Sequence, residues 1–170
     1  MAERYVVFSH GRDSEPWGSK IAAMAEIARE EGFHVESVDY RGMMDPKDRV
    51  TRLLAFCKDL RGQLVLVGSS MGGYVSVAGS SLLQARGMFL LAPALYMPGY
   101  EKFSPRPAMC PTTIIHGWRD EVIPVENSFR FAREQRATLH VVDSDHRLLD
   151  QIRAINHYFA YFLYAIDEYQ

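Results

Sequence analysis

Six short apolar runs, none of them alternating with polar residues, constrain the fold of this 170-residue chain more than any other feature. Most are rich in β-branched side chains. Strands of this kind are covered on both faces, as in a parallel sheet whose crossover helices lie on either side. The sequence therefore predicts a mostly parallel sheet of about six strands. The runs span residues 5–8, 35–40, 64–67, 88–92, 112–115 and 138–142.

Helical patterns separate most of these runs. One pattern, residues 21–31, is closed by Gly32, and another, residues 46–60, opens with Asp45 as N-cap. A third helical pattern follows the serine–glycine segment near residue 70, and a fourth begins near Val125. Because strands and helices alternate, we predict a three-layer, doubly wound α/β fold that forms one domain over residues 1–170.

The last helical pattern carries an apolar stripe with three- and four-residue spacing, which is typical of a helix docked on a sheet. The stripe consists of Leu148, Ile152, Ile155, Phe159, Phe162, Leu163 and Ile166. Tyr158, Tyr161 and Tyr164 recur beside it and are interpreted as tyrosines at the edge of the docked face. The alternative interpretation is that these three side chains form a homodimer contact.

Composition and charge argue against several classes of partner. The 19 Lys and Arg are scattered among 21 Asp and Glu, so no nucleic-acid partner is expected. No uncharged apolar run is long enough to cross a membrane, and the start lacks the features of a secretory signal, so we expect no membrane partner and a cytoplasmic location. Cys57 and Cys110 lack metal-ligand spacing, and the histidines show no metal motif, so no metal is expected.

The segment Gly68-Ser69-Ser70-Met71-Gly72 fits the pattern G-x-S-x-G between a strand and a helix. Only Ser70 fits the central position, because centring on Ser69 would put Val67 and Met71 where glycines belong. The glycines leave room for a sharp, strained turn that exposes one hydroxyl. A structural glycine cluster and a phosphate-binding loop are the alternatives, but the sequence holds neither G-x-x-x-x-G-K-[ST] nor G-x-G-x-x-G.

A serine nucleophile needs a base and a carboxylate, in the chain order serine, acid, histidine for this architecture. Asp120 follows a strand end in "TIIHGWRDEVIP", and His146 follows the last strand in "HVVDSDHRLLD". We therefore predict Ser70, His146 and Asp120 as a catalytic triad. Asp120 could instead pair with Arg119. Three other acids lie too near His146 along the chain to fit the order; they are Asp143, Asp145 and Asp150.

An oxyanion needs two backbone N–H donors. The residue after the nucleophile, Met71, supplies the first, and we assign the second to the N–H of Arg12, after the first strand. His10 is interpreted as a residue that holds this loop. The Arg12 side chain either favours acidic substrates or reaches solvent.

These motifs together resemble the α/β-hydrolase superfamily: H-G after the first strand, G-x-S-x-G, H-G-x-x-D ahead of I-P, and D-H before the last helix. The chain is most similar to small, lidless hydrolases and esterases of that superfamily, with the first two strands of the larger fold missing. The resemblance covers nearly the whole chain. It implies the strand order 2-1-3-4-5-6 and no cofactor.

Residues 93–111 occupy the place where relatives carry a lid, but this segment is too short for a cap domain. We expect an ordered loop that lines an open apolar pocket for small or short-chain acyl groups. The predicted lining residues are Leu95, Tyr96, Met97 and Phe103.

The sequence thus predicts a serine hydrolase acting on a small-molecule ester or thioester through an acyl-enzyme. The same site also serves peptidases, and some relatives bind a small ligand or a protein partner without catalysis. An intact set of three residues favours catalysis. A nucleotide-binding switch protein is disfavoured because the phosphate loop is missing.

Overall fold

A computed structural model describes residues 2–168, which form a six-stranded, fully parallel sheet with the order β2-β1-β3-β4-β5-β6. This confirms the predicted sheet and strand order. The strands are β1 (Arg4–Ser9), β2 (His34–Val38), β3 (Gln63–Ser69), β4 (Gly87–Leu91), β5 (Thr112–Gly117) and β6 (Thr138–Val142). The helices are α1 (Ser19–Glu30), α2 (Pro46–Cys57), α3 (Met71–Ser80), α4 (Val125–Gln135) and α5 (Ile152–Glu168).

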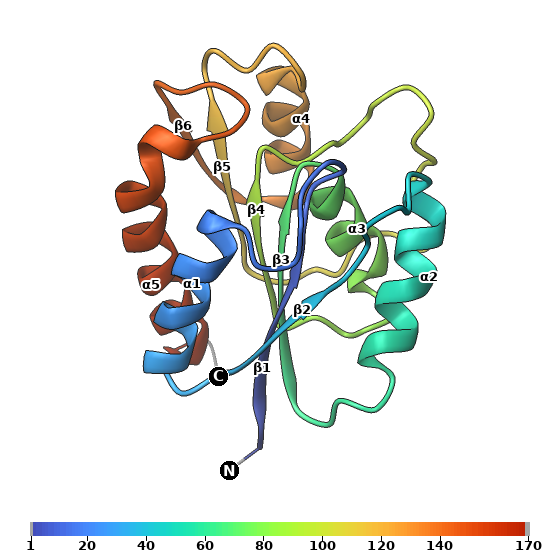
Figure 1. Ribbon diagram of the computed structural model, residues 1–170, viewed down its shortest axis with the longest axis vertical. Coiled ribbons are helices and arrows are strands. Elements are labelled where there is room, and N and C mark those ends of the chain that lie inside the picture. Colours follow the sequence, from blue (N-terminus) through green and yellow to red (C-terminus); the bar gives the residue numbers. More distant parts are fainter. Residues whose placement is uncertain (1, 169–170) are drawn as a thin grey trace.

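The sheet separates two hydrophobic cores. Helices α1 and α5 cover one face, and α2, α3 and α4 cover the other (Figure 1). Because successive side chains of a strand point to opposite faces, Val65 joins the core under α1 and α5, whereas Leu66 joins the core under α2 and α3. This alternation explains why the central runs are apolar throughout.

The outer strands depart from the prediction of full burial. Most residues of β2 and β6 are only partly buried, while β4 and β5 are buried throughout. The outer strands have a neighbouring strand on one side only and carry polar residues such as Glu36 and His140. A β-branched run therefore indicated a strand but not its place in the sheet.

Helix boundaries follow local chemistry. Asp45 caps α2 as predicted, since its Oδ1 accepts a hydrogen bond from the N–H of Lys47 at 2.8 Å. The helix ends at Cys57 rather than at residue 60. Leu148 has φ 57° and precedes a short 3₁₀ turn (Leu149–Gln151), so it lies outside α5 although it belongs to the apolar stripe.

The three tyrosines of α5 differ in their surroundings. Tyr158 stacks on His140, with ring centroids 3.9 Å apart, and is partly buried as interpreted from the sequence. Tyr161 and Tyr164 instead point into solvent, with exposed fractions of 72% and 60%. No helix among residues 2–168 is long and apolar enough to cross a membrane.

Because all strands are parallel, their carboxyl ends meet at one edge of the sheet, the place where such folds bind ligands. Four connections converge there, at the upper end in Figure 1. They are residues 10–18 after β1, Ser70 after β3, residues 118–124 after β5 and residues 143–148 after β6. No lid domain covers this edge, because the segment between β4 and β5 spans only residues 92–111.

Candidate active site

Ser70 sits at the sharp turn between β3 and α3, with φ 53° and ψ −118°. A Cβ atom on Gly68 would lie 2.2 Å from the carbonyl oxygen of Gly72, and one on Gly72 would lie 1.9 Å from the carbonyl oxygen of Ser9. No side chain fits at either position. The two glycines therefore allow the turn to pass directly over β1 and present the Ser70 hydroxyl at the sheet edge.

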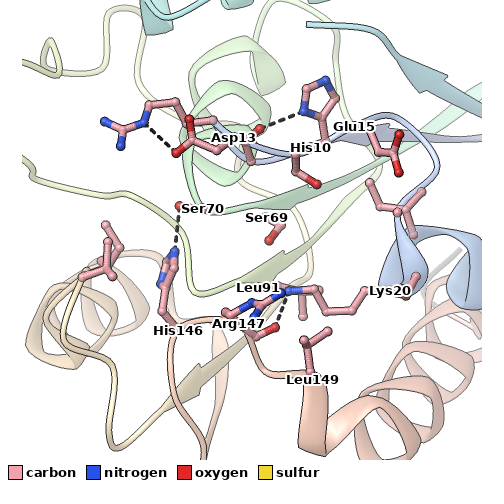
Figure 2. A pocket seen from close by; sticks show the side chains of 18 of the residues that line it. His10, Asp13, Glu15, Lys20, Ser69, Ser70, Leu91, His146, Arg147 and Leu149 are labelled. Atoms are coloured by element: carbon pink, nitrogen blue, oxygen red, sulfur yellow. Dashed lines mark hydrogen bonds and ion pairs between the residues drawn. The ribbon is translucent and has the colours of Figure 1, made fainter. Parts of the chain in front are cut away.

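A continuous chain of hydrogen bonds joins the three residues predicted to act together. His146 Nε2 lies 3.0 Å from Ser70 Oγ (Figure 2), and His146 Nδ1 lies 2.7 Å from Asp120 Oδ2. Because a carboxylate faces Nδ1, that nitrogen carries the proton, and Nε2 is left to accept the Ser70 hydroxyl proton. The arrangement has the geometry of a serine activated by a general base.

The Asp120 carboxylate is fully buried yet richly hydrogen-bonded. Its Oδ1 accepts from the N–H groups of Val122 at 2.9 Å and Ile123 at 2.8 Å. Burial pushes the pKa of Asp120 upward, but the hydrogen bonds from His116, His146 and these two N–H groups outweigh it and hold the pKa well below its ordinary value. The carboxylate is therefore ionised at neutral pH.

His116, at the end of β5, contacts Asp120, and this contact was not predicted from the sequence. It is fully buried, and its Nε2 lies 3.1 Å from Asp120 Oδ2 and 3.0 Å from the carbonyl oxygen of Ile123. Both neighbours are acceptors, so Nε2 carries a proton, and Nδ1 accepts from the Ser128 hydroxyl at 2.8 Å. His116 thus donates to the same Asp120 oxygen, Oδ2, that His146 contacts. It is the histidine of the H-G-x-x-D motif, which was the available signal.

The other candidate acids lie elsewhere. Arg119 pairs with Asp143 at 2.7 Å rather than with Asp120. Asp145 accepts from the N–H of Arg147 at 2.9 Å, and Asp150 accepts from the Ser144 hydroxyl. Among these carboxylates, only Asp120 reaches His146.

The loop after β1 is fixed by a buried arginine. Arg49 of α2 is fully buried, and its Nη1 donates to the carbonyl oxygen of His10 at 2.8 Å and of Gly11 at 3.3 Å. Its Nη2 donates to that of Arg12 at 3.1 Å, and its Nε to that of Met43 at 2.8 Å. Four carbonyl groups, without a carboxylate, therefore compensate this buried charge. The helical pattern gave no sign of this role.

These contacts orient the predicted oxyanion donors. In a trans peptide the C=O and the following N–H point in opposite directions, so the N–H of Arg12 faces away from Arg49. A Cβ on Gly11 would lie 3.6 Å from Ser70 Cβ, which puts this loop beside the serine. Met71 is the first residue of α3, where an N–H has no intrahelical acceptor. Within residues 2–168, no hydrogen bond uses either N–H.

His10 has the structural role expected of it. Its Nδ1 contacts the carbonyl oxygen of Gly11 at 2.8 Å, and its Nε2 accepts from the N–H of Tyr40 at 2.9 Å. Desolvation by burial lowers the pKa of His10. A neutral His10 therefore ties the loop after β1 to the end of β2.

A cleft of about 920 Å³ opens beside Ser70 and His146. Of the four predicted lining residues, only Met97 lies on its wall, together with Pro98 and Tyr100. The prediction is corrected for the other three residues. Leu95 is fully buried and belongs to the core under α3.

Tyr96 and Phe103 face other elements. Tyr96 donates its hydroxyl to Glu134 of α4 at 2.8 Å, while Phe103 stacks on Tyr74 with ring centroids 5.3 Å apart. Apolar composition identified this segment as ordered but could not tell which side chains face the cleft.

The comparisons with known proteins agree with this architecture. A family model described as the alpha/beta hydrolase family matches residues 6–167. No curated protein matches the sequence. A structure from Xanthomonas campestris pv. campestris, assigned by its description to the α/β superfamily, is 30% identical, with a TM-score of 0.89 and coverage of 96% of this chain and 99% of that one.

Two more distant structures are similar in fold. Est1E from Butyrivibrio proteoclasticus is 16% identical, with a TM-score of 0.82 and coverage of 98% of this chain and 89% of that one. A protein from Xanthomonas campestris described as a serine hydrolase without lid is 18% identical, with a TM-score of 0.73 and coverage of 97% and 83%.

Proposed function

Because the chain belongs to the α/β-hydrolase family and is a hydrolase by fold and relatives, we propose that it is a serine hydrolase that cleaves a small or short-chain carboxylic ester or thioester. One observation carries the proposal: the hydrogen-bonded chain from Asp120 through His146 to Ser70, with distances of 2.7 and 3.0 Å.

In the proposed reaction, Ser70 Oγ attacks the substrate carbonyl carbon while His146 Nε2 takes the hydroxyl proton. The N–H groups of Met71 and Arg12 stabilise the oxyanion, and Asp120 stabilises the imidazolium. His146 then protonates the leaving alcohol or thiol, and the acyl group remains on Ser70. A water molecule, deprotonated by His146, attacks this acyl-enzyme and releases the carboxylic acid.

The open edge supports a small substrate. Residues 92–111 form a loop rather than a lid, and Met97, Pro98 and Tyr100 are the residues of this loop that lie on the cleft wall. An uncovered cleft buries little of a long acyl chain, so added methylene groups gain little binding energy. Activity is therefore expected to level off at short or medium chain length.

Hydrolysis of nitrophenyl acetate, butyrate and octanoate, an acyl thioester and a peptide amide tests this function. The wild type is expected to cleave the short esters or the thioester, and folded Ser70→Ala is expected to lose this activity. Ser69→Ala is the matched control, because the adjacent serine lies outside the hydrogen-bonded chain. Cleavage of the amide alone would make the protein a peptidase. No cleavage by the wild type would favour a binding protein.

A further inference from the structure

Two cations lie together on one wall of the cleft. Lys20, in the first turn of α1, and Arg147, directly after His146, both line the cleft. Lys20 Nζ donates to the carbonyl oxygen of Arg147 at 2.5 Å, which leaves two of its three N–H bonds for other acceptors. Figure 2 shows the lysine side chain extending from α1 to Arg147, in the segment that carries His146.

Neither cation has an ion-pair partner in the part of the chain that the structure describes. Among residues 2–168, no carboxylate lies within salt-bridge distance of Lys20 or of the Arg147 guanidinium. Arg12, the cation that the sequence analysis connected with acidic substrates, is instead paired with Asp13 at 3.2 Å. In Figure 2, Asp13 and Glu15 lie away from Lys20 and Arg147, on the other side of the cleft.

The charged form of Lys20 is destabilised by its surroundings. Desolvation by burial, followed by repulsion from Arg147, lowers the pKa of Lys20 to about 8, although Asp145 acts in the opposite direction. An anion bound between the two cations would offset both effects. The N-terminus of α1 adds to the positive potential around the two cations. Its first turn holds no acidic residue, and Gly18, its N-cap, provides no side-chain hydrogen bond.

We propose that Lys20 and Arg147 form a subsite for an anionic group of the substrate, so that the preferred substrate is an ester or thioester that also carries a carboxylate. The inference takes the cleft of the proposed function as the substrate site. Arg147 is adjacent to His146, so the charged group would lie next to the reacting ester.

Binding tests the subsite independently of catalysis. Glutarate is expected to bind wild type and Ser70→Ala at least tenfold more tightly than glutaramide, its neutral diamide, as measured by calorimetry, and to lose this advantage in Lys20→Gln and Arg147→Gln. Arg153→Gln is the matched control, since Arg153 is exposed on α5 and lies outside the cleft. Equal binding of glutarate and the neutral diamide, or an advantage that survives in Lys20→Gln, would overturn the proposal.

Two matched ester pairs locate the charged group. Monoethyl glutarate and ethyl pentanoate differ by a carboxylate on the acyl side; butanoyl glycolate and propyl butanoate differ on the alcohol side. The anionic-to-neutral ratio of kcat/KM is expected to fall at least tenfold in Lys20→Gln for one pair. Unchanged ratios for both pairs contradict the subsite. If the wild type hydrolysed none of the esters but still bound glutarate, the proposed function would be contradicted and the anion subsite would not.

Stability provides a readout that a merely structural lysine would not give. Because the pKa of folded Lys20, about 8, lies below its ordinary 10.5, the ammonium destabilises the fold below pH 8, and this cost is relieved between pH 8 and 10.5. Arg147 and Asp145 are the charged groups that act on Lys20. The Tm of Lys20→Met relative to wild type is expected to be higher at pH 7 than at pH 10. A pH-independent difference would mean that Lys20 carries no unfavourable charge to be offset by a ligand.

Discussion

The turn at residues 68–73 and the loop at residues 92–111 both border the cleft, but different forces determine them. At the turn, backbone approaches backbone so closely that a Cβ on Gly72 would lie 1.9 Å from Ser9. In the loop, a Cβ on Gly99 would meet nothing within 4 Å, and side chains such as Phe103 determine the packing. Steric exclusion leaves a readable residue pattern, whereas side-chain packing permits many sequences.

Replacing one glycine in each region, Gly72 in the turn and Gly99 in the loop, separates the two by their loss of stability. Gly72→Ala is expected to lower the free energy of unfolding by roughly 3 kcal/mol or more, since the clash is with backbone that cannot move aside. Gly99→Ala is expected to cost about 1–2 kcal/mol, for the positive φ of 82° alone. Urea denaturation measures both. Similar losses would show that the turn is no more constrained than the loop.

Asp120→Asn tests whether the reactivity of the Ser70 hydroxyl depends on the buried Asp120 carboxylate. Its kcat is expected to fall by about 10⁴-fold, because an amide cannot stabilise the imidazolium and can favour the wrong tautomer of His146. Ester hydrolysis and circular dichroism on the same preparation separate chemistry from folding. A folded variant with nearly full activity would remove Asp120 from the mechanism.

Arg49→Lys tests the loop after β1, which lies beside Ser70 and is held by Arg49. Lysine keeps the charge but cannot reach four carbonyl groups, so the loop that carries the Arg12 N–H should shift. We expect kcat to fall by roughly 10²-fold with little change in KM, since Arg49 does not line the cleft. Arg52→Lys, on the same helix, is the matched control. An effect on Tm without one on kcat would limit Arg49 to a structural role.

The smallest effects concern the loop itself. Met97→Ala is expected to raise KM for a butyrate ester by about tenfold or less, because Met97 lines the cleft. Phe103→Ala should instead lower Tm and leave KM nearly unchanged, since Phe103 packs on Tyr74. Steady-state kinetics and thermal melting distinguish the two. A reversed pattern would restore the lining expected from the sequence.

Most of the fold could be predicted from the sequence, because continuous apolar runs and helix caps are local signals. The sequence also predicted which residues meet at Ser70, since glycine crowding and chain order are steric and topological requirements. Contacts that depend on three-dimensional packing escaped it. Arg49 looked like any polar helix residue, yet it is fully buried, and Leu95 looked like a pocket residue, yet it lies in the core.

If Ser70 is an activated nucleophile, it reacts with a fluorophosphonate, and the intact mass of the protein after exposure to this reagent reports the reaction. We predict one adduct on the wild type and none on folded Ser70→Ala. The absence of an adduct on the wild type, while a known serine hydrolase is labelled in the same tube, or an equal adduct on both proteins, would contradict this role of Ser70.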